Sequence, residues 1–174
     1  MVEESIGRIF IAGIQAFVAF AFTVLSVYTG TGLFDRLTRS IDEWKEIKRG
    51  NAAVGIVMLA LVIAIVFITS PQIISVSAID LYGIQTGILL TFLFVRLISM
   101  VITLVLGVVT IFIAIRLFDH ITVDIDENKE LKRGNVALAL VLSALILGIA
   151  LIARDVIFVF MNVIGLERIM GLVG

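Results

Sequence analysis

The chain has 174 residues, of which 61% are hydrophobic and 16% charged, with a mean hydropathy of +1.21. A soluble domain is about half apolar and a quarter charged, so this composition indicates a protein that crosses a membrane several times. The formal net charge of −1 gives no reason to expect nucleic-acid binding. The chain has no cysteine and one histidine, His120, so we expect no disulfide, metal site or cofactor.

Four apolar runs are long enough to cross a hydrocarbon core of about 30 Å at about 1.5 Å per residue. They lie at residues 9–34, 50–70, 87–115 and 134–153, and the second ends before the only proline, Pro71. Residues 72–85 are mixed in character and are expected to form an outer loop or to lie in the interface. A shorter apolar run at 156–166 is expected to lie flat or to pack against the bundle. The sequence therefore predicts an all-α, polytopic membrane protein with four transmembrane helices.

The segment that joins the first two apolar runs recurs between the last two. Residues 33–51 read LFDRLTRSIDEWKEIKRGN and residues 117–135 read LFDHITVDIDENKELKRGN, with 13 of 19 positions identical at an offset of 84 residues. A repeat of fixed period sets the architecture. We therefore divide the one membrane domain into a first repeat (1–84), a second repeat (85–168) and a C-terminal tail (169–174).

Two apolar runs separate the two copies of the motif, so both copies face the same side of the membrane. The halves are thus expected to be tandem parallel repeats, related by a pseudo-twofold axis along the membrane normal. Nine of the 13 Lys and Arg residues lie in or beside the motifs. By the positive-inside rule, the motif loops are cytoplasmic and both termini are external, in the cell (inner) membrane.

Each motif carries the signals of a short helix. Ser40 with Glu43 fits a capping box, and in the second copy Asp124 takes the cap position and Glu127 the box position. The helix is expected to end near Lys48 or Lys132. The acids then stand early and the bases late in each helix, which suits the helix dipole.

Glycine and asparagine close both motifs. Gly50 and Gly134 suit a left-handed helix end, and Asn51 and Asn135 are placed to cap the next membrane helix. A solvated, self-paired hairpin is the interpretation that we favour, and a partner-binding or gating surface is the alternative. The charged motif positions are Asp42, Glu43, Lys45, Glu46, Lys48, Arg49, Asp126, Glu127, Lys129, Glu130, Lys132 and Arg133.

Asp35 and Asp119 follow the apolar ends of their helices at the cytoplasmic side. The repeat axis is expected to bring them near Asn51 and Asn135, in a ring that attracts cations into a vestibule. The alternative, which we favour, is that each carboxylate pairs with a nearby base such as Lys48 or Lys132.

Small residues recur on one face of the second and fourth apolar helices, where they allow membrane helices to approach closely. They are Ala53, Ala60 and Ala64 in the first copy and Ala137, Ala144 and Gly148 in the second. Their recurrence favours a helix-packing role.

Two charges occur only in the second half. Arg96 lies within the third apolar run and Asp155 lies just past the fourth, and the aligned positions are Ala12 and Pro71. Their joint appearance suggests an ion pair. The alternative is that Arg96 reaches lipid phosphates and Asp155 pairs with Arg154.

The repeated motif, with its I-D-E-x-K-E-[IL]-K-R-G-N ending, resembles the YjfL-like family of small inner-membrane proteins, a domain of unknown function. The resemblance covers both halves of the chain. It implies four membrane helices and an internal duplication, and it implies no activity or site residues.

The chain has no Walker loop and no Ser–His pair in a buried context, so we expect no enzymatic activity. The leading prediction is a homo-oligomeric membrane protein that presents paired charged hairpins to a cytoplasmic protein partner, as a scaffold or binding protein. The alternative is an ion or small-solute channel subunit with an Asp/Asn mouth.

Overall fold

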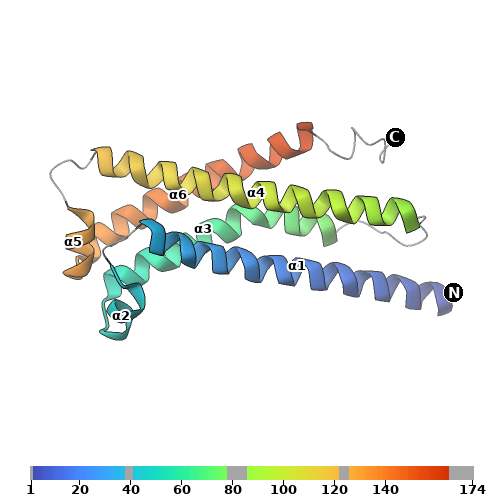
Figure 1. The fold of residues 1–174 in the computed structure, drawn as a ribbon, viewed down its shortest axis with the longest axis horizontal. Coiled ribbons are helices and arrows are strands. Elements are labelled where there is room, and N and C mark those ends of the chain that lie inside the picture. The colour runs from blue at the N-terminus through green and yellow to red at the C-terminus, as the bar shows by residue number, and fades with distance from the viewer. Residues whose placement is uncertain (1, 38–40, 78–85, 122–125, 165–174) are drawn as a thin grey trace.

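The computed structural model describes residues 2–37, 41–77, 86–121 and 126–164, and the regular elements in these ranges are all α-helices. In chain order they are α1 (Val2–Leu37), α2 (Glu43–Lys48), α3 (Ala52–Ser77), α4 (Thr86–Ile121), α5 (Glu127–Lys132) and α6 (Val136–Ile164) (Figure 1). The predicted all-α class is therefore confirmed for the described part of the chain.

Four of these helices are long and apolar enough to cross a membrane. The candidate spans are Ser5–Thr29 in α1, Ala52–Ile74 in α3, Leu90–Phe118 in α4 and Val136–Asn162 in α6. At about 1.5 Å per residue, each exceeds the ~30 Å thickness of a hydrocarbon core. The four apolar helices indicate a multi-pass membrane protein.

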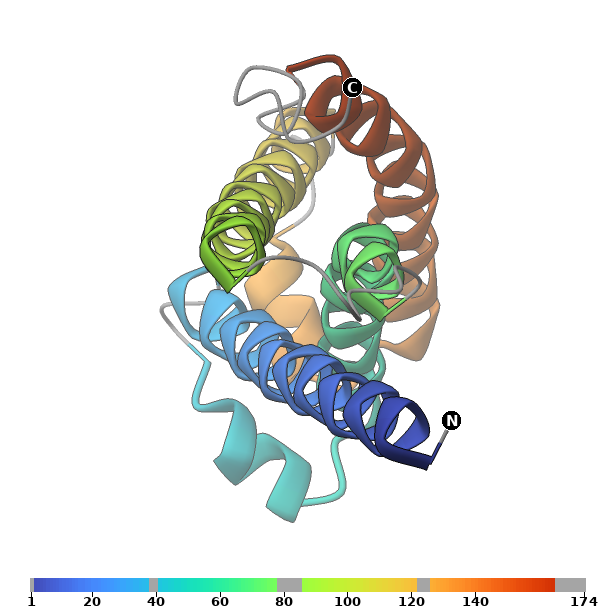
Figure 2. The ribbon, with the colours of Figure 1, turned by 90° about the vertical axis from the view of Figure 1, so that its right-hand side faces the viewer.

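The long helices run lengthwise beside one another, and the short helices α2 and α5 lie at the same end of the bundle (Figure 1). The start of α1 and the end of α6 lie at the opposite end. Figure 2, viewed along the bundle, places α3 between α1 and α6. The helix α3 packs most extensively on α6 and also on α1 and α4, whereas α6 packs on α3 and α4.

The central helix contributes several of the most buried large side chains. Leu61, Ile65 and Ile68 of α3 are at most 1% exposed. On the outer helices many large apolar side chains point outward, such as Phe17 of α1 and Ile152 of α6, which are 71% and 70% exposed. Such surfaces are expected where a helix faces lipid, because lipid tails are as apolar as the side chains.

The helix α3 does not end at Pro71, as the sequence predicted, but continues through it to Ser77. Proline has no N–H for the carbonyl of Phe67, four residues earlier, and normally interrupts a helix for that reason. The hydroxyl of Ser70 donates to the Phe67 carbonyl instead, at 2.9 Å. This bond satisfies the freed carbonyl, which is the usual way in which membrane helices tolerate proline.

The apolar segment 156–166, predicted as a separate piece, is largely part of α6, which runs without interruption from Val136 to Ile164. The charges of Arg154 and Asp155 suggested the end of a span. They do not break the helix, because both side chains reach outward and are partly or largely exposed. Ile157 and Met161, beyond these charges, are both buried at 7% exposure.

One close approach fixes α4 against α3. A Cβ atom added to Gly107 of α4 would lie 2.8 Å from Cγ2 of Ile68 in α3. Contacts this short are not made by real Cβ atoms, so only glycine allows the two helices to approach as they do. The sequence-equivalent position in α1 is Thr23, whose hydroxyl donates to the carbonyl of Ala19 at 2.8 Å.

The small-residue faces of the two halves differ in burial. In α3, Ala53, Ala60 and Ala64 are buried, at 0%, 3% and 0% exposure. The equivalent residues of α6, which are Ala137, Ala144 and Gly148, are exposed on the single chain. Within one chain this face therefore packs in α3 only, because α6 buries a different face that includes Ala139, Ser143 and Ala150.

Candidate functional site

The candidate site is the pair of charged hairpins formed by α2 and α5 with the turns that follow them. Each short helix begins after an aspartate: the carboxylates of Asp42 and Asp126 accept from the N–H groups of Lys45 and Lys129, both at 3.0 Å. The caps predicted at Ser40 and Asp124 are therefore wrong by two residues. The motif contains two capping residues in succession, and the second is used; Ser40 and Asp124 lie outside the described residues.

The ends of both short helices follow the prediction. The helices end at Lys48 and Lys132, and the two glycines that follow have φ angles of +82° and +80°. Such left-handed angles favour glycine, which has no Cβ. The side chains of Asn51 and Asn135 then accept from the N–H groups of Val54 and Leu138, at 3.3 and 3.1 Å, so both cap the following membrane helix as predicted.

A glutamate in each short helix bonds to two residues of the turn that follows it. Glu46 pairs with Arg49 at 3.1 Å and accepts from the amide of Asn51 at 3.2 Å. In the second copy Glu130 pairs with Arg133 at 2.8 Å and accepts from Asn135 at 3.0 Å. The matched bonds hold both hairpins in one local shape. This supports the self-paired interpretation for these charges, although the exposed pairs themselves add little stability.

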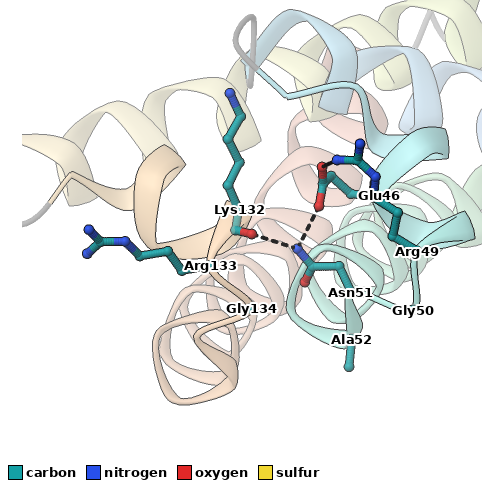
Figure 3. Close-up of a pocket in the computed structure, with 8 residues that line it drawn as sticks. All are labelled: Glu46, Arg49, Gly50, Asn51, Ala52, Lys132, Arg133 and Gly134. Carbon is teal, nitrogen blue, oxygen red and sulfur yellow. Dashed lines mark hydrogen bonds and ion pairs between the residues drawn. The ribbon is translucent and has the colours of Figure 1, made fainter.

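Among the described residues, the amide of Asn51 joins the two hairpins, and the equivalent Asn135 makes no corresponding bond. The amide of Asn51 donates to the Leu131 carbonyl at 2.9 Å and to the Lys132 carbonyl at 3.4 Å. Figure 3 shows the bond to Lys132. The sequence missed this link because the two motifs are nearly identical, and nothing local distinguishes which asparagine crosses to the other hairpin.

An open, shallow depression of about 400 Å³ lies between the hairpins. It is lined by Glu46, Arg49, Gly50, Asn51, Ala52, Lys132, Arg133 and Gly134 (Figure 3). Three of its side chains are basic and one is acidic, and both arginines already pair with glutamates of their own hairpins. The depression is therefore a polar, mildly basic surface rather than an enclosed ligand site.

Most motif charges face solvent. Asp42, Lys45, Lys48 and Arg49 of the first copy are exposed, as are Asp126, Lys129, Lys132 and Arg133 of the second. Glu43 is the exception, with 5% exposure, whereas its equivalent Glu127 is half-buried. The described part of the chain has no cluster of acids or histidine that suits a metal ion.

The predicted cation-attracting ring lies partly outside the described residues. The side chains of Asp35 and Asp119 are not described, although their backbones belong to α1 and α4. Asn51 and Asn135 do lie at the hairpin end of the bundle, and both amides are used within the hairpins.

The suggested ion pair between Arg96 and Asp155 is not formed among the described residues. Asp155 is 82% exposed and lies near its neighbour Arg154, with Nε and Oδ1 4.0 Å apart. The guanidinium of Arg96 lies over the ring of Phe92, 5.2 Å from its centroid, on the same face of α4. The structure thus has the pairing of Asp155 that the sequence left as the alternative.

The hydrogen bonds around Glu130 lower the pKa of its carboxyl below the ordinary value of 4.5, chiefly through the amide of Asn135 and next through Arg133. A lowered pKa means that the folded hairpin favours the carboxylate. This contribution to stability is present above the unfolded pKa and is lost as the pH falls through the folded pKa.

We therefore expect Asn135→Ala to raise the pKa of Glu130 toward its ordinary value, as measured by NMR titration of the carboxyl carbon in detergent micelles. Arg49→Ala is the matched control, because Arg49 pairs with Glu46 of the first hairpin and not with Glu130. A Glu130 titration that is the same in the Asn135 variant and the unmodified protein would show that this bond is not made.

The comparisons with known proteins identify the family. The sequence model of a domain of unknown function, DUF350, matches residues 8–103 and again residues 92–174. The chain belongs to the DUF350 family. The expected membership of a domain of unknown function is thus confirmed, while the narrower YjfL-like designation stays a prediction. Comparison of this DUF350 chain with curated proteins and with solved structures gave no match.

Proposed function

We propose that this DUF350 chain is a non-enzymatic, homo-oligomeric protein of the cell membrane that presents its paired charged hairpins to a cytoplasmic protein partner. The two halves are tandem parallel repeats related by an approximate twofold axis along the membrane normal. Both hairpins face the cytoplasm and both termini face outward. The protein serves as a scaffold or binding platform.

The observation that carries this proposal is the link between the hairpins, the 2.9 Å bond from Asn51 to Leu131. It holds two ordered hairpins at one end of the bundle, with the exposed bases of both around a shared depression. A loop that only connects two helices would function without a fixed arrangement of the two hairpins. An exposed polar surface of fixed shape suits recognition of another macromolecule.

The alternative of a channel subunit receives less support. A cation mouth requires Asn51 and Asn135 to face a conducting path, and both side chains cap helices and bond to glutamates instead. Cation flux through the reconstituted protein, lowered by Asp35→Asn with Asp119→Asn, would favour the channel over the platform.

Single cysteines test the topology, because the chain has none of its own. Lys48→Cys and Gly174→Cys are treated in intact cells with a thiol reagent that does not cross membranes. We expect labelling at position 174, and labelling at position 48 only after the cells are permeabilised. Labelling at 48 but not at 174 in intact cells would reverse the proposed orientation.

A photo-activatable amino acid at Lys48 or Lys132 tests the platform itself. Both side chains are exposed on the hairpins. On irradiation of living cells, we expect each position to form an adduct with the same discrete cytoplasmic protein. Leu90, 62% exposed at the other end of the bundle, is the control and should yield none. Hairpin positions that behave like Leu90 would remove the partner-binding proposal.

A further inference from the structure

The helices α3 and α6, which are equivalent in sequence at an offset of 84 residues, bury different faces. Ala60, Ala64 and Ile68 form a stripe on α3 that is at most 3% exposed. Their equivalents on α6 are Ala144, Gly148 and Ile152, and all three are exposed, Ile152 by 70%. The stripe on α6 has the spacing and residue character of a packed face, but no described residue of the chain covers it.

The first helices of the two halves show the converse difference. Met100 and Leu104 of α4 are buried, at 0% and 8% exposure. The equivalent residues of α1 are Ala16, which is exposed, and Phe20, which is 68% exposed. One face of α1 is therefore also left uncovered by the part of the chain that the structure describes.

Within the chain, the buried counterparts of these two faces meet each other. The Cβ position of Gly107, on the same face of α4 as Leu104, lies 2.8 Å from Ile68 of α3. The equivalent positions are Thr23 on α1 and Ile152 on α6, helices that do not pack together appreciably in one chain (Figure 2). The uncovered faces of α1 and α6 are thus the sequence equivalents of the faces of α4 and α3 that pack against each other.

The hairpin end repeats this pattern. Asn51 donates across the halves to the carbonyl of Leu131. Asn135 has the same cap geometry and the same bond to its own glutamate, Glu130, so one hydrogen of its amide has no acceptor among the described residues. The acceptor equivalent to Leu131 is the carbonyl of Ile47, on the hairpin of the first half.

We propose that these faces join copies of the chain head to tail. The exposed stripe of α6 packs against α1 of a second copy, in the same way as α3 packs against α4 within one chain. In this contact Ile152 lies against Thr23 of the next copy, and the amide of Asn135 donates to its Ile47 carbonyl. This inference rests on the proposed homo-oligomer and adds its interface. The operation is a rotation about the membrane normal, so all copies keep one orientation, and a heterologous contact of this kind generates rings where the rotation closes.

One substitution between the halves alters the contact. Thr23 replaces the glycine that allows α4 its close approach, so the helices of neighbouring copies cross at a larger separation than α3 and α4.

The test uses two single-cysteine variants, Thr23→Cys and Ile152→Cys, co-expressed with different tags and oxidised with copper phenanthroline in native membranes. We expect a cross-linked dimer that carries both tags and much less dimer from either variant alone. A contact of identical faces would instead cross-link one variant with itself. That result, or no mixed dimer from a protein that is oligomeric by size, overturns the head-to-tail interface while leaving the oligomer intact.

Ala144→Leu provides a second measurement, since this residue is exposed on the chain and lies on the stripe. We expect the variant to fold and to lose the oligomer in size-exclusion chromatography with light scattering. The matched control is Ala21→Leu, exposed on α1 away from the face that bears Ala16 and Phe20. An Ala144 variant that assembles as well as the Ala21 variant contradicts the inference, and an unmodified protein that is monomeric in the membrane removes the proposed homo-oligomer as well.

Discussion

Replacement of Gly107 by alanine is expected to destabilise the bundle by ~1–3 kcal/mol, the range typical of overpacking in a tight core. The added Cβ would lie 2.8 Å from Cγ2 of Ile68. That methyl sits on a β-branched carbon of a residue with 1% exposure, so it cannot rotate away without disturbing its own neighbours. Either α4 or α3 must shift. Unfolding monitored by circular dichroism during SDS titration of the detergent-solubilised protein measures the loss.

The control for Gly107→Ala is Gly55→Ala in α3, where an added Cβ meets nothing within 4 Å. That variant should be neutral or slightly stabilised, because alanine favours helices over glycine. The double variant Gly107→Ala with Ile68→Ala removes the clashing methyl and should lose less than the sum of the two single variants. Equal stability of the Gly107 and Gly55 variants would mean that α4 does not approach α3 as closely as the structure has it.

The hairpins were predictable because their signals are local. Gly50 must adopt a left-handed angle to end the helix, and Asn51 follows at the position that caps the next one. Neither depends on distant contacts. The start of the helix was misplaced for a similar local reason, since the motif offers Ser40 and Asp42 two residues apart and local pattern does not rank them.

The sequence underestimates the lengths of two membrane helices. Pro71 predicts a helix end because it has no N–H, whereas Arg154 and Asp155 end the apolar run without breaking the helix, since charged residues keep every backbone hydrogen bond. In lipid the backbone has no water to bond to, so continuing the helix is favoured wherever a side chain such as Ser70 satisfies the freed carbonyl.

The packing of the two halves was not predictable from their similarity. The residue is alanine at both equivalent positions, yet Ala60 is buried and Ala144 is exposed. The difference originates in contacts between the halves, such as that of Gly107 with Ile68, which a repeat pattern does not encode.

Replacement of the two capping asparagines is expected to cause unequal losses of folding stability. Asn51→Ala is expected to destabilise the monomer in detergent by about 2 kcal/mol, of which about 1 is the lost helix cap and about 1 the lost bond to the Leu131 carbonyl. Asn135→Ala removes an equivalent cap but no bond between the halves, so it should cost about 1 kcal/mol under the same conditions. SDS titration of both variants measures the difference.

The comparison between the two asparagines isolates the link, because their caps and their bonds to glutamate match within a few tenths of an ångström. Hydrogen exchange provides the site-specific readout. Loss of the Asn51 amide should speed exchange in α5 and its turn, which belong to the other half of the chain. Loss of the Asn135 amide should affect only its own hairpin and the start of α6. Equal stability losses with exchange confined to each variant's own half would show that the hairpins are held independently, and the shared surface that they present would then have no fixed shape.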